Sequence, residues 1–289
     1  MRNYILLGAC ISMLFGCAKE EDVTPSESRN MYDCPDFSSQ EEMKLRRDFY
    51  KETGSFLLFN DSLGYVDRYT PQGYLHICEV LDLNYEVTSG TQSVFNFTYL
   101  RDYEKQQQVA GWLAKEVLPM LPAAWRPYAI LLTDDFLCSE YIADSWSSSV
   151  RPEKMMAAFS TYYALIVGCN DVFDMDDEKK QAYKREVLMR ILRKSLSMLD
   201  EHELTDFYQY SDAYYDTRYS GDSKEVGLLK GVIFTFTYYE KVRDLQSYVH
   251  EIFTMTEEEF TEKYAQWDLV LKKRDALVKI LEKHGVKVY

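Results

Sequence analysis

The stretch Asp176–Leu199 reads DDEKKQAYKREVLMRILRKSLSML and carries the strongest secondary-structure signal in the chain. Its acidic start favours a helix N-terminus, because carboxylates interact well with the positive end of the helix dipole. Its apolar residues then recur every three or four positions, the spacing of one helix face: Val187, Leu188, Ile191, Leu192, Leu196 and Leu199. The stretch therefore predicts a long amphipathic helix with one buried face.

Upstream of this helix, short runs of β-branched, aromatic and aliphatic residues are bounded by Gly, Asp or Asn, which is typical of strands. Two helices are expected among them, at residues 39–52 and 102–118, the second ended by Pro119 and Pro122. The predicted strands are Ser55–Asn60, Tyr74–Leu81, Val94–Leu100, Tyr128–Thr133 and Tyr162–Val167. This order indicates a mixed α and β fold.

Downstream, the pattern is helical apart from a tyrosine-rich loop at residues 207–219. Helices are expected near 224–242, 244–253 and 256–285. Thr256 and Glu259 have the spacing of a capping box, and Gly285 is typical of a C-terminal cap. We predict a single α+β domain over residues 37–289, with a mixed sheet, a long central helix and a helical C-terminal part.

Composition restricts the partners. The chain has 289 residues, of which 46% are hydrophobic, enough for a full core. Its formal net charge is -14, and loss of Arg2 with a cleaved signal would make the mature chain about one unit more negative. Such a charge argues against nucleic acid or an anionic membrane surface as a partner.

The N-terminus has the layout of an export signal, with Arg2 followed by a short apolar run and then Gly16 and Cys17. The run is too short for a transmembrane helix, which needs about 20 residues. Leu14-Phe15-Gly16-Cys17 resembles the lipobox of bacterial lipoproteins, which implies a signal peptide at 1–16 and lipidation of Cys17. A flexible tether is expected at 17–36, and its Lys19-Glu20-Glu21-Asp22 resembles the surface-export signal of Bacteroidota lipoproteins. The chain is thus expected at the outer membrane, lipid-anchored and displayed on the cell surface.

No intact catalytic motif is present. The sequence has four histidines in four separate segments and lacks H-E-x-x-H, a G-x-S-x-G elbow, a P-loop and G-x-G-x-x-G. The nearest metal motif is His202-Glu203-x-x-Asp206, in which a carboxylate replaces the second histidine. Its alternative interpretation is a polar helix end. Aspartates 134, 135, 171, 174, 176 and 177 could supply paired carboxylates for glycoside hydrolysis or for binding calcium, or act as turn and cap residues.

Aromatic and cysteine residues leave further alternatives open. Exposed tyrosines in the 207–219 loop could bind a sugar or peptide, or could pack the loop onto the domain; they are Tyr208, Tyr210, Tyr214, Tyr215 and Tyr219. Cys34, Cys78, Cys138 and Cys169 have no C-x-x-C spacing. Export permits disulfides, but the apolar surroundings of the last three cysteines also suit buried free thiols.

The lipobox, the run Lys51–Asn60, the long helix and the segment Leu204–Ser211 together resemble the zinc-binding metallopeptidase lipoproteins of Bacteroidota. The resemblance extends over residues 37–289 and includes the ending from Asp244 to Arg274. It implies a zincin-like fold.

This chain departs from that family at the metal site. Where the family has H-E-x-x-H, the long helix here runs Leu188–Leu196 and carries Arg190, Arg193 and Lys194. No catalytic residue carries over, so the resemblance implies a degenerate, metallopeptidase-like member without a cofactor.

We therefore weigh two hypotheses. The first is a pseudoenzyme that binds a peptide, a glycan or an outer-membrane partner protein. The second is an active hydrolase, either a zinc peptidase using His202, Glu203 and Asp206 or a carboxylate-based glycosidase.

Overall fold

The computed structural model describes residues 30, 32, 38–81, 91–143, 148–150, 154–161, 164–169, 171–229, 232–233 and 237–288. Residues Tyr32–Tyr289 form one compact unit and Met1–Met31 another. The predicted signal peptide, Cys17 and Cys34 lie outside the described residues. Within the described part of the chain, no helix is long and apolar enough to cross a membrane.

The unit from Tyr32 onward is an α+β fold, as expected, built on a mixed sheet. Strands β1 (Phe56–Leu58), β5 (Ala129–Ala143) and β9 (Leu165–Gly168) are parallel, and β8 (Ala158–Ser160) pairs antiparallel with β9. The far half of β5 pairs antiparallel with β4 (Thr91–Tyr99), β6 (Ser148–Val150) and β7 (Lys154–Met155). Strand β5 continues well past the predicted end at Thr133, because Asp134 and Asp135 lie at a bulge within the strand, between the pairs Tyr99–Thr133 and Phe97–Phe136, instead of forming a turn.

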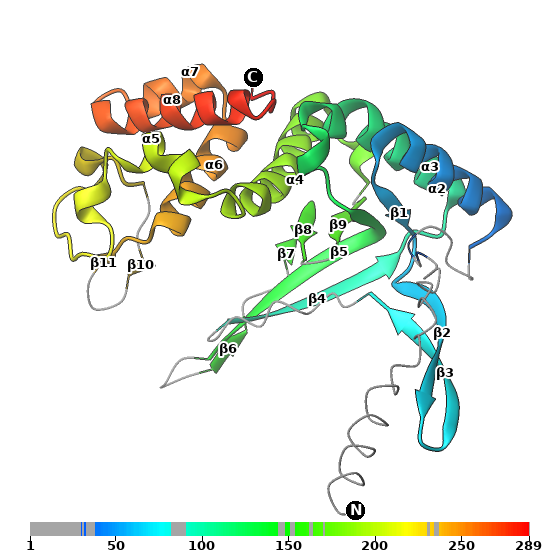
Figure 1. The fold of residues 1–289 in the computed structure, drawn as a ribbon. Helices are drawn as coiled ribbons and strands as arrows, with labels where there is room; N and C mark the ends of the chain where they lie inside the picture. The colour runs from blue at the N-terminus through cyan, green and yellow to red at the C-terminus, as the bar shows by residue number, and fades with distance from the viewer. Residues whose placement is uncertain are drawn as a thin grey trace, which may run out of the picture. The chain divides into compact units, whose positions relative to one another are not determined.

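Three helices cover one face of this sheet (Figure 1): α2 (Gln40–Thr53), α3 (Tyr103–Trp112) and α4 (Asp177–Ser197). Helix α2 begins with a capping box between Ser39 and Glu42 and ends at Gly54, whose φ of 79° suits glycine. A π-helical turn, Leu113–Val117, extends α3 toward α4. The predicted helices at 39–52 and 102–118 are therefore confirmed.

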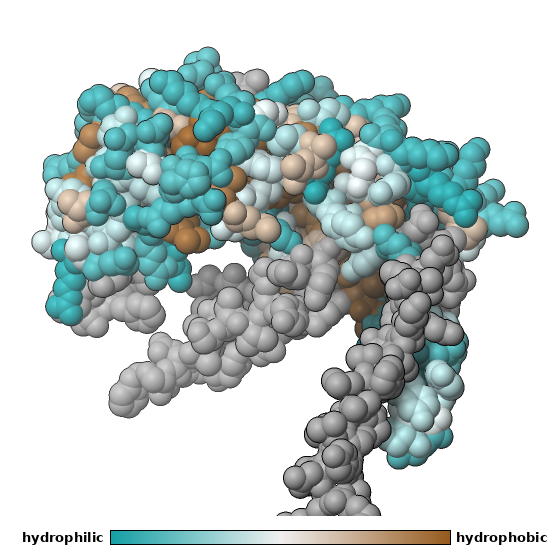
Figure 2. All heavy atoms as spheres, in the orientation of Figure 1, coloured by the Kyte–Doolittle hydropathy of each residue, from teal (hydrophilic) through white to brown (hydrophobic). Residues whose placement is uncertain are grey.

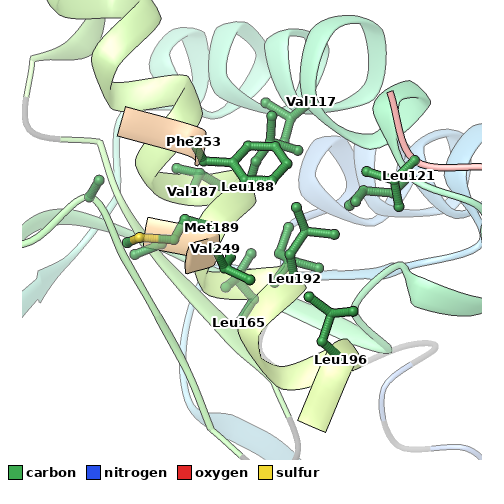
Figure 3. Close-up of a cluster of buried hydrophobic side chains, with 14 of the residues drawn as sticks. Val117, Leu121, Leu165, Val187, Leu188, Met189, Leu192, Leu196, Val249 and Phe253 are labelled. Carbon is green, nitrogen blue, oxygen red and sulfur yellow. The ribbon is translucent and has the colours of Figure 1, made fainter. Parts of the chain in front are cut away.

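Helix α4 occupies the place that its sequence predicts, with its apolar face in the core. Val187, Leu188, Leu192 and Leu196 are each at most 1% exposed. Figure 3 shows this face directed toward residues of the π-helical turn, of β9 and of helix α6 (Lys241–Thr254), including Val117, Leu165, Val249 and Phe253. The charged side chains of α4 consequently lie away from this buried face.

The C-terminal part contradicts one predicted helix. The described residues between 224 and 240 do not form a helix: Ser223–Val226 is a short 3-10 turn, and strands β10 (Val232–Ile233) and β11 (Thr237–Tyr238) follow. The left-handed Gly227, with a φ of 74°, ends the turn, and β-branched residues favour the strands. Helix α6 then matches the predicted 244–253 helix. The predicted 256–285 segment divides into α7 (Glu257–Lys263), opened by the expected capping box, and α8 (Asp268–Lys283).

Strands β2 (Ser62–Thr70) and β3 (Gly73–Val80) form a separate hairpin, of which only β3 is expected from the sequence. Among the described strands, β2 and β3 pair only with each other. The hairpin projects from the main sheet in Figure 1, and its side chains appear in pale and teal shades in Figure 2. Its tip is exposed, with Tyr69 and Tyr74 at 75% and 78%.

Candidate functional site

Helix α4 places three cations in one pocket. Arg190, Arg193 and Lys194 are three and four residues apart, so they lie on one side of the helix. Burial of the neighbouring Ile191 and Leu192 fixes the rotation of α4 and so fixes the direction of the cations. The pocket has a volume of about 240 Å³ and lies between α4, strand β8 and helix α6. It is lined by Phe159, Ser160, Arg190, Arg193, Lys194, Ser197 and Gln246.

Neutral groups hold two of these cations. Nη2 of Arg193 donates to Oε1 of Gln246 at 2.7 Å. Nζ of Lys194 donates to the carbonyl of Thr161, directly after β8, at 2.5 Å. The bond to Gln246 orients the Arg193 guanidinium without neutralising its charge.

The third cation, Arg190, lies closer to a carboxylate. Its Nη2 is 3.6 Å from Oε1 of Glu186, one turn earlier in α4. Its Nε is buried and has no hydrogen-bond partner among the described residues. Ser160 donates to the carbonyl of Arg190 at 3.0 Å, which ties β8 to this turn of the helix.

Burial lowers the pKa of the Arg193 guanidinium, and the nearby charge of Arg190 lowers it further. Both shifts start from a value so high that arginine stays charged at neutral pH. Within the described part of the chain, no carboxylate lies within ion-pair distance of Arg193. The pocket is therefore positively charged in a chain whose net charge is -14.

The predicted metal motif lies elsewhere, in a 3-10 turn (Glu201–Leu204) and the short helix α5 (Thr205–Tyr208). The side chain of His202 is 77% exposed and lies 3.9 Å from Asp200, whereas Glu203 lies 3.2 Å from Nε2 of His284. Asp206 is exposed. No three His, Cys, Asp or Glu side chains among the described residues form a possible metal-binding group.

The tyrosines of the 207–219 loop pack in large part onto the domain. Tyr208 and Tyr215 are each 6% exposed and meet edge to face at 5.6 Å. Tyr214 and Tyr219 are half-buried and contact each other at 5.2 Å, and Tyr210 is also half-buried. Tyr208 and Tyr215 are thus unavailable as an exposed platform, because they belong to the core.

A buried polar network is the main feature that sequence reasoning missed. Lys273 and Asp244 are 0% and 1% exposed in their side chains, and their Nζ and Oδ2 atoms are 2.5 Å apart. Nζ also donates to the hydroxyls of Ser211, at 2.9 Å, and Tyr215, at 3.0 Å. Burial raises the pKa of Asp244 and lowers that of Lys273, since desolvation penalises both charges. The available signal was the position of Lys273, three residues after Val270 and four before Leu277, within the apolar face of α8.

The predicted acidic cluster is divided between caps and ion pairs. Asp176 is the N-cap of α4 and accepts from the backbone N–H of Lys179 at 2.8 Å. Lys105 lies 3.7 Å from Asp134 and 3.3 Å from Asp171, so it compensates both carboxylates. The described cysteines Cys78, Cys138 and Cys169 form no disulfide with one another; Cys138 and Cys169 are buried, as the buried-thiol interpretation expects, whereas Cys78 is half-buried.

Comparison of the chain with protein-family models, with curated proteins and with solved structures found no match. The resemblance to metallopeptidase lipoproteins therefore depends on the residues of this chain and stays a prediction.

Proposed function

We propose that this chain is a lipid-anchored, surface-displayed binding protein, a non-catalytic relative of zinc-binding metallopeptidase lipoproteins. The observation that carries the proposal is the presence of Arg190, Arg193 and Lys194 in the α4 pocket. By the resemblance, α4 is the helix that would hold the metal. A peptide, glycan or outer-membrane protein would be the partner, and nucleic acid would not.

The residues at this place do not fit a zinc ion. Zinc ligands donate a lone pair from a thiolate, an imidazole or a carboxylate, whereas guanidinium and ammonium groups have none to donate at neutral pH. Three positive charges would also repel a divalent cation. The side chains of α4 at this pocket are therefore suited to bind, and not to activate water through a metal.

A hydrolysis assay tests the non-catalytic part of the proposal. The full mature lipoprotein in non-ionic detergent is incubated with denatured casein and with a mixed polysaccharide, with and without added zinc. We expect no cleavage above the buffer control. Cleavage that is lost in Glu203→Gln but kept in Glu225→Gln, a carboxylate outside the H-E-x-x-D motif, would support the hydrolase hypothesis instead.

Lipid labelling tests the anchor. Cells expressing the chain are grown with radiolabelled palmitate, and the protein is recovered by an affinity tag at its C-terminus. Because the acyl chains attach to the cysteine of the lipobox, we expect label on the wild type and on Cys10→Ser but none on Cys17→Ser. Equal labelling of Cys17→Ser would remove the anchor from the proposal.

A further inference from the structure

The α4 pocket concentrates positive charge, because Arg190, Arg193 and Lys194 line it together. The sequence offers 47 acidic residues against 33 basic ones. Even so, the described side chains that line the pocket are three cations, Phe159, two serines and Gln246, and none of these is a carboxylate. A cleft lined by charges of one sign attracts ions of the opposite sign, so this lining favours an anion.

The contacts inside the pocket agree with this interpretation. The guanidinium of Arg193 is fixed by a neutral amide, and the ammonium of Lys194 by a main-chain carbonyl. Partial burial of a charge costs free energy unless a counterion or hydrogen bonds compensate it. For Arg193, the described residues supply one orienting hydrogen bond and no counterion, so an anionic ligand would recover part of that cost.

The geometry of the arginine side chain also favours a particular kind of anion. Its planar guanidinium presents paired N–H donors that match two oxygens of a carboxylate or phosphate group. Arg190 and Arg193, one turn apart, can address one such group from two sides. Lys194 adds a point charge at the same level of the helix.

The remaining lining restricts the group that carries the anion. Phe159 is half-buried and contacts Phe95 at 4.5 Å, so one side of the pocket is aromatic. A volume of about 240 Å³ lies below the roughly 300–1,000 Å³ typical of pockets for drug-sized ligands. The pocket thus suits one side chain or chain end, and not a whole oligosaccharide.

We infer that the α4 pocket binds an oxyanion, a carboxylate or a phosphate, attached to an aromatic or apolar group that lies against Phe159. This inference depends on the proposed function only in that Arg190, Arg193 and Lys194 face a ligand and not a metal. It names the chemistry by which a peptide or metabolite would be recognised.

Calorimetric titration of the full mature lipoprotein in non-ionic detergent tests the inference with three small probes. N-acetyl-L-phenylalanine carries a carboxylate, phenyl phosphate carries a phosphate, and N-acetyl-L-phenylalanine amide is the neutral match of the first. We expect at least one anion to bind at one site per chain, and the amide to bind roughly tenfold more weakly or worse, as loss of a charge-assisted hydrogen bond implies. The anionic probe with the higher affinity shows whether the pocket prefers a carboxylate or a phosphate.

Variants locate the binding. Arg193→Gln and Arg190→Gln should each lower the affinity for the preferred anion by roughly tenfold. Arg185→Gln is the matched control, because it removes the same charge from α4 at a position that lines a different groove. Its affinity should equal that of the wild type.

The inference is overturned if neither anion binds, if the amide binds as tightly as the anions, or if Arg185→Gln weakens binding as much as Arg193→Gln. Thermal melting monitors folding of every variant. If Arg193→Gln unfolds, two measurements still test the inference: the affinity of Arg190→Gln for the anion, and the affinities of the wild type for the acid and for the amide. None of these results depends on hydrolysis or zinc content, so failure here is distinct from failure of the proposed function.

Discussion

Cations on one helix can have different roles. Lys194 joins α4 to the chain after β8 through the Thr161 carbonyl, so it contributes to the fold as well as to the charge of the pocket. Arg193 is bound by a single side-chain amide, and Arg190 has a carboxylate 3.6 Å away. The two arginines are therefore the better residues for testing ligand binding.

The buried Lys273–Asp244 pair predicts a strong effect of a single substitution. Lys273→Met leaves the Asp244 carboxylate buried without its cation, and breaking a buried pair in this way costs about 3–5 kcal/mol. We expect the free energy of unfolding, measured by guanidinium denaturation, to fall by that amount. Asp244→Leu combined with Lys273→Met should restore part of the loss, because no charge is then left buried.

The neighbouring residue is the control for this prediction. Lys272 forms an exposed ion pair with Asp268 at 2.6 Å, and pairs of this kind contribute at most about 1 kcal/mol. Lys272→Met should hence leave stability almost unchanged. Equal losses in Lys272→Met and Lys273→Met would contradict the role assigned to the buried network.

At the scale of elements, local signals determined what could be predicted. Helix α4 was predictable because its apolar spacing extends over several turns, and α2 and α7 because their capping boxes lie in the sequence. The 224–242 region was mispredicted because Gly227 and the strand-favouring residues after it were outweighed by an expected helical pattern. The long β5 was missed beyond Thr133 since paired aspartates are more common in turns than in strands.

The hairpin β2–β3 is expected to be dispensable for stability. Its outer residues are mostly exposed, and the buried Leu63 and Leu81 lie at its base. Replacing Val66–Ile77 by Asn-Gly joins Tyr65 to Cys78, which are directly opposite in the register, through a turn suited to hairpins. The melting temperature should change by less than about 3 °C, which corresponds to about 1 kcal/mol in a domain of this size.

A core substitution provides the contrast. Leu57 in β1 is 1% exposed, and Leu57→Ala should cost about 2–5 kcal/mol. If the shortened hairpin lowers the melting temperature as much as Leu57→Ala does, the hairpin is part of the cooperative unit and the expectation is wrong.

For the whole molecule, tyrosine and cysteine side chains with a raised pKa predict that stability falls at alkaline pH. Burial raises the pKa of Tyr99 and Tyr264 from 10.0 to about 12, with Asp61 and Glu251 adding to the respective shifts, and burial raises that of the Cys169 thiol from 9.0 to about 12. Because the folded state keeps these protons to higher pH, their contribution is fully present below pH 9 and is lost as pH rises toward 12. We expect the guanidinium midpoint to be level between pH 7 and 8.5 and to fall from pH 9 upward.

The negative net charge would produce a similar trend through self-repulsion, so the titration is repeated in high salt, which screens surface charges. A fall that persists in high salt is the predicted result. A midpoint that stays constant to pH 11 under both conditions would show that these three groups titrate alike in the folded and unfolded chain.

The candidate site was partly predictable at this scale. The cations of α4 could be located from the sequence, because the helix and its buried face were clear. The pocket itself could not be predicted. Its other lining residues, Phe159, Ser160 and Gln246, come from β8 and α6, and local sequence patterns do not show which elements pack together. The Lys273–Asp244 network was missed for the same reason, because it joins two separate helices, α8 and α6.

The central claim is that this scaffold binds a ligand through cations and does not hold a catalytic metal. The most direct measurement is the zinc content of the purified protein, determined by elemental mass spectrometry after equilibration with zinc and removal of the excess. The account predicts much less than one zinc ion per chain, with no difference between the wild type and His202→Ala. One zinc ion per chain in the wild type, lost in His202→Ala, would contradict it.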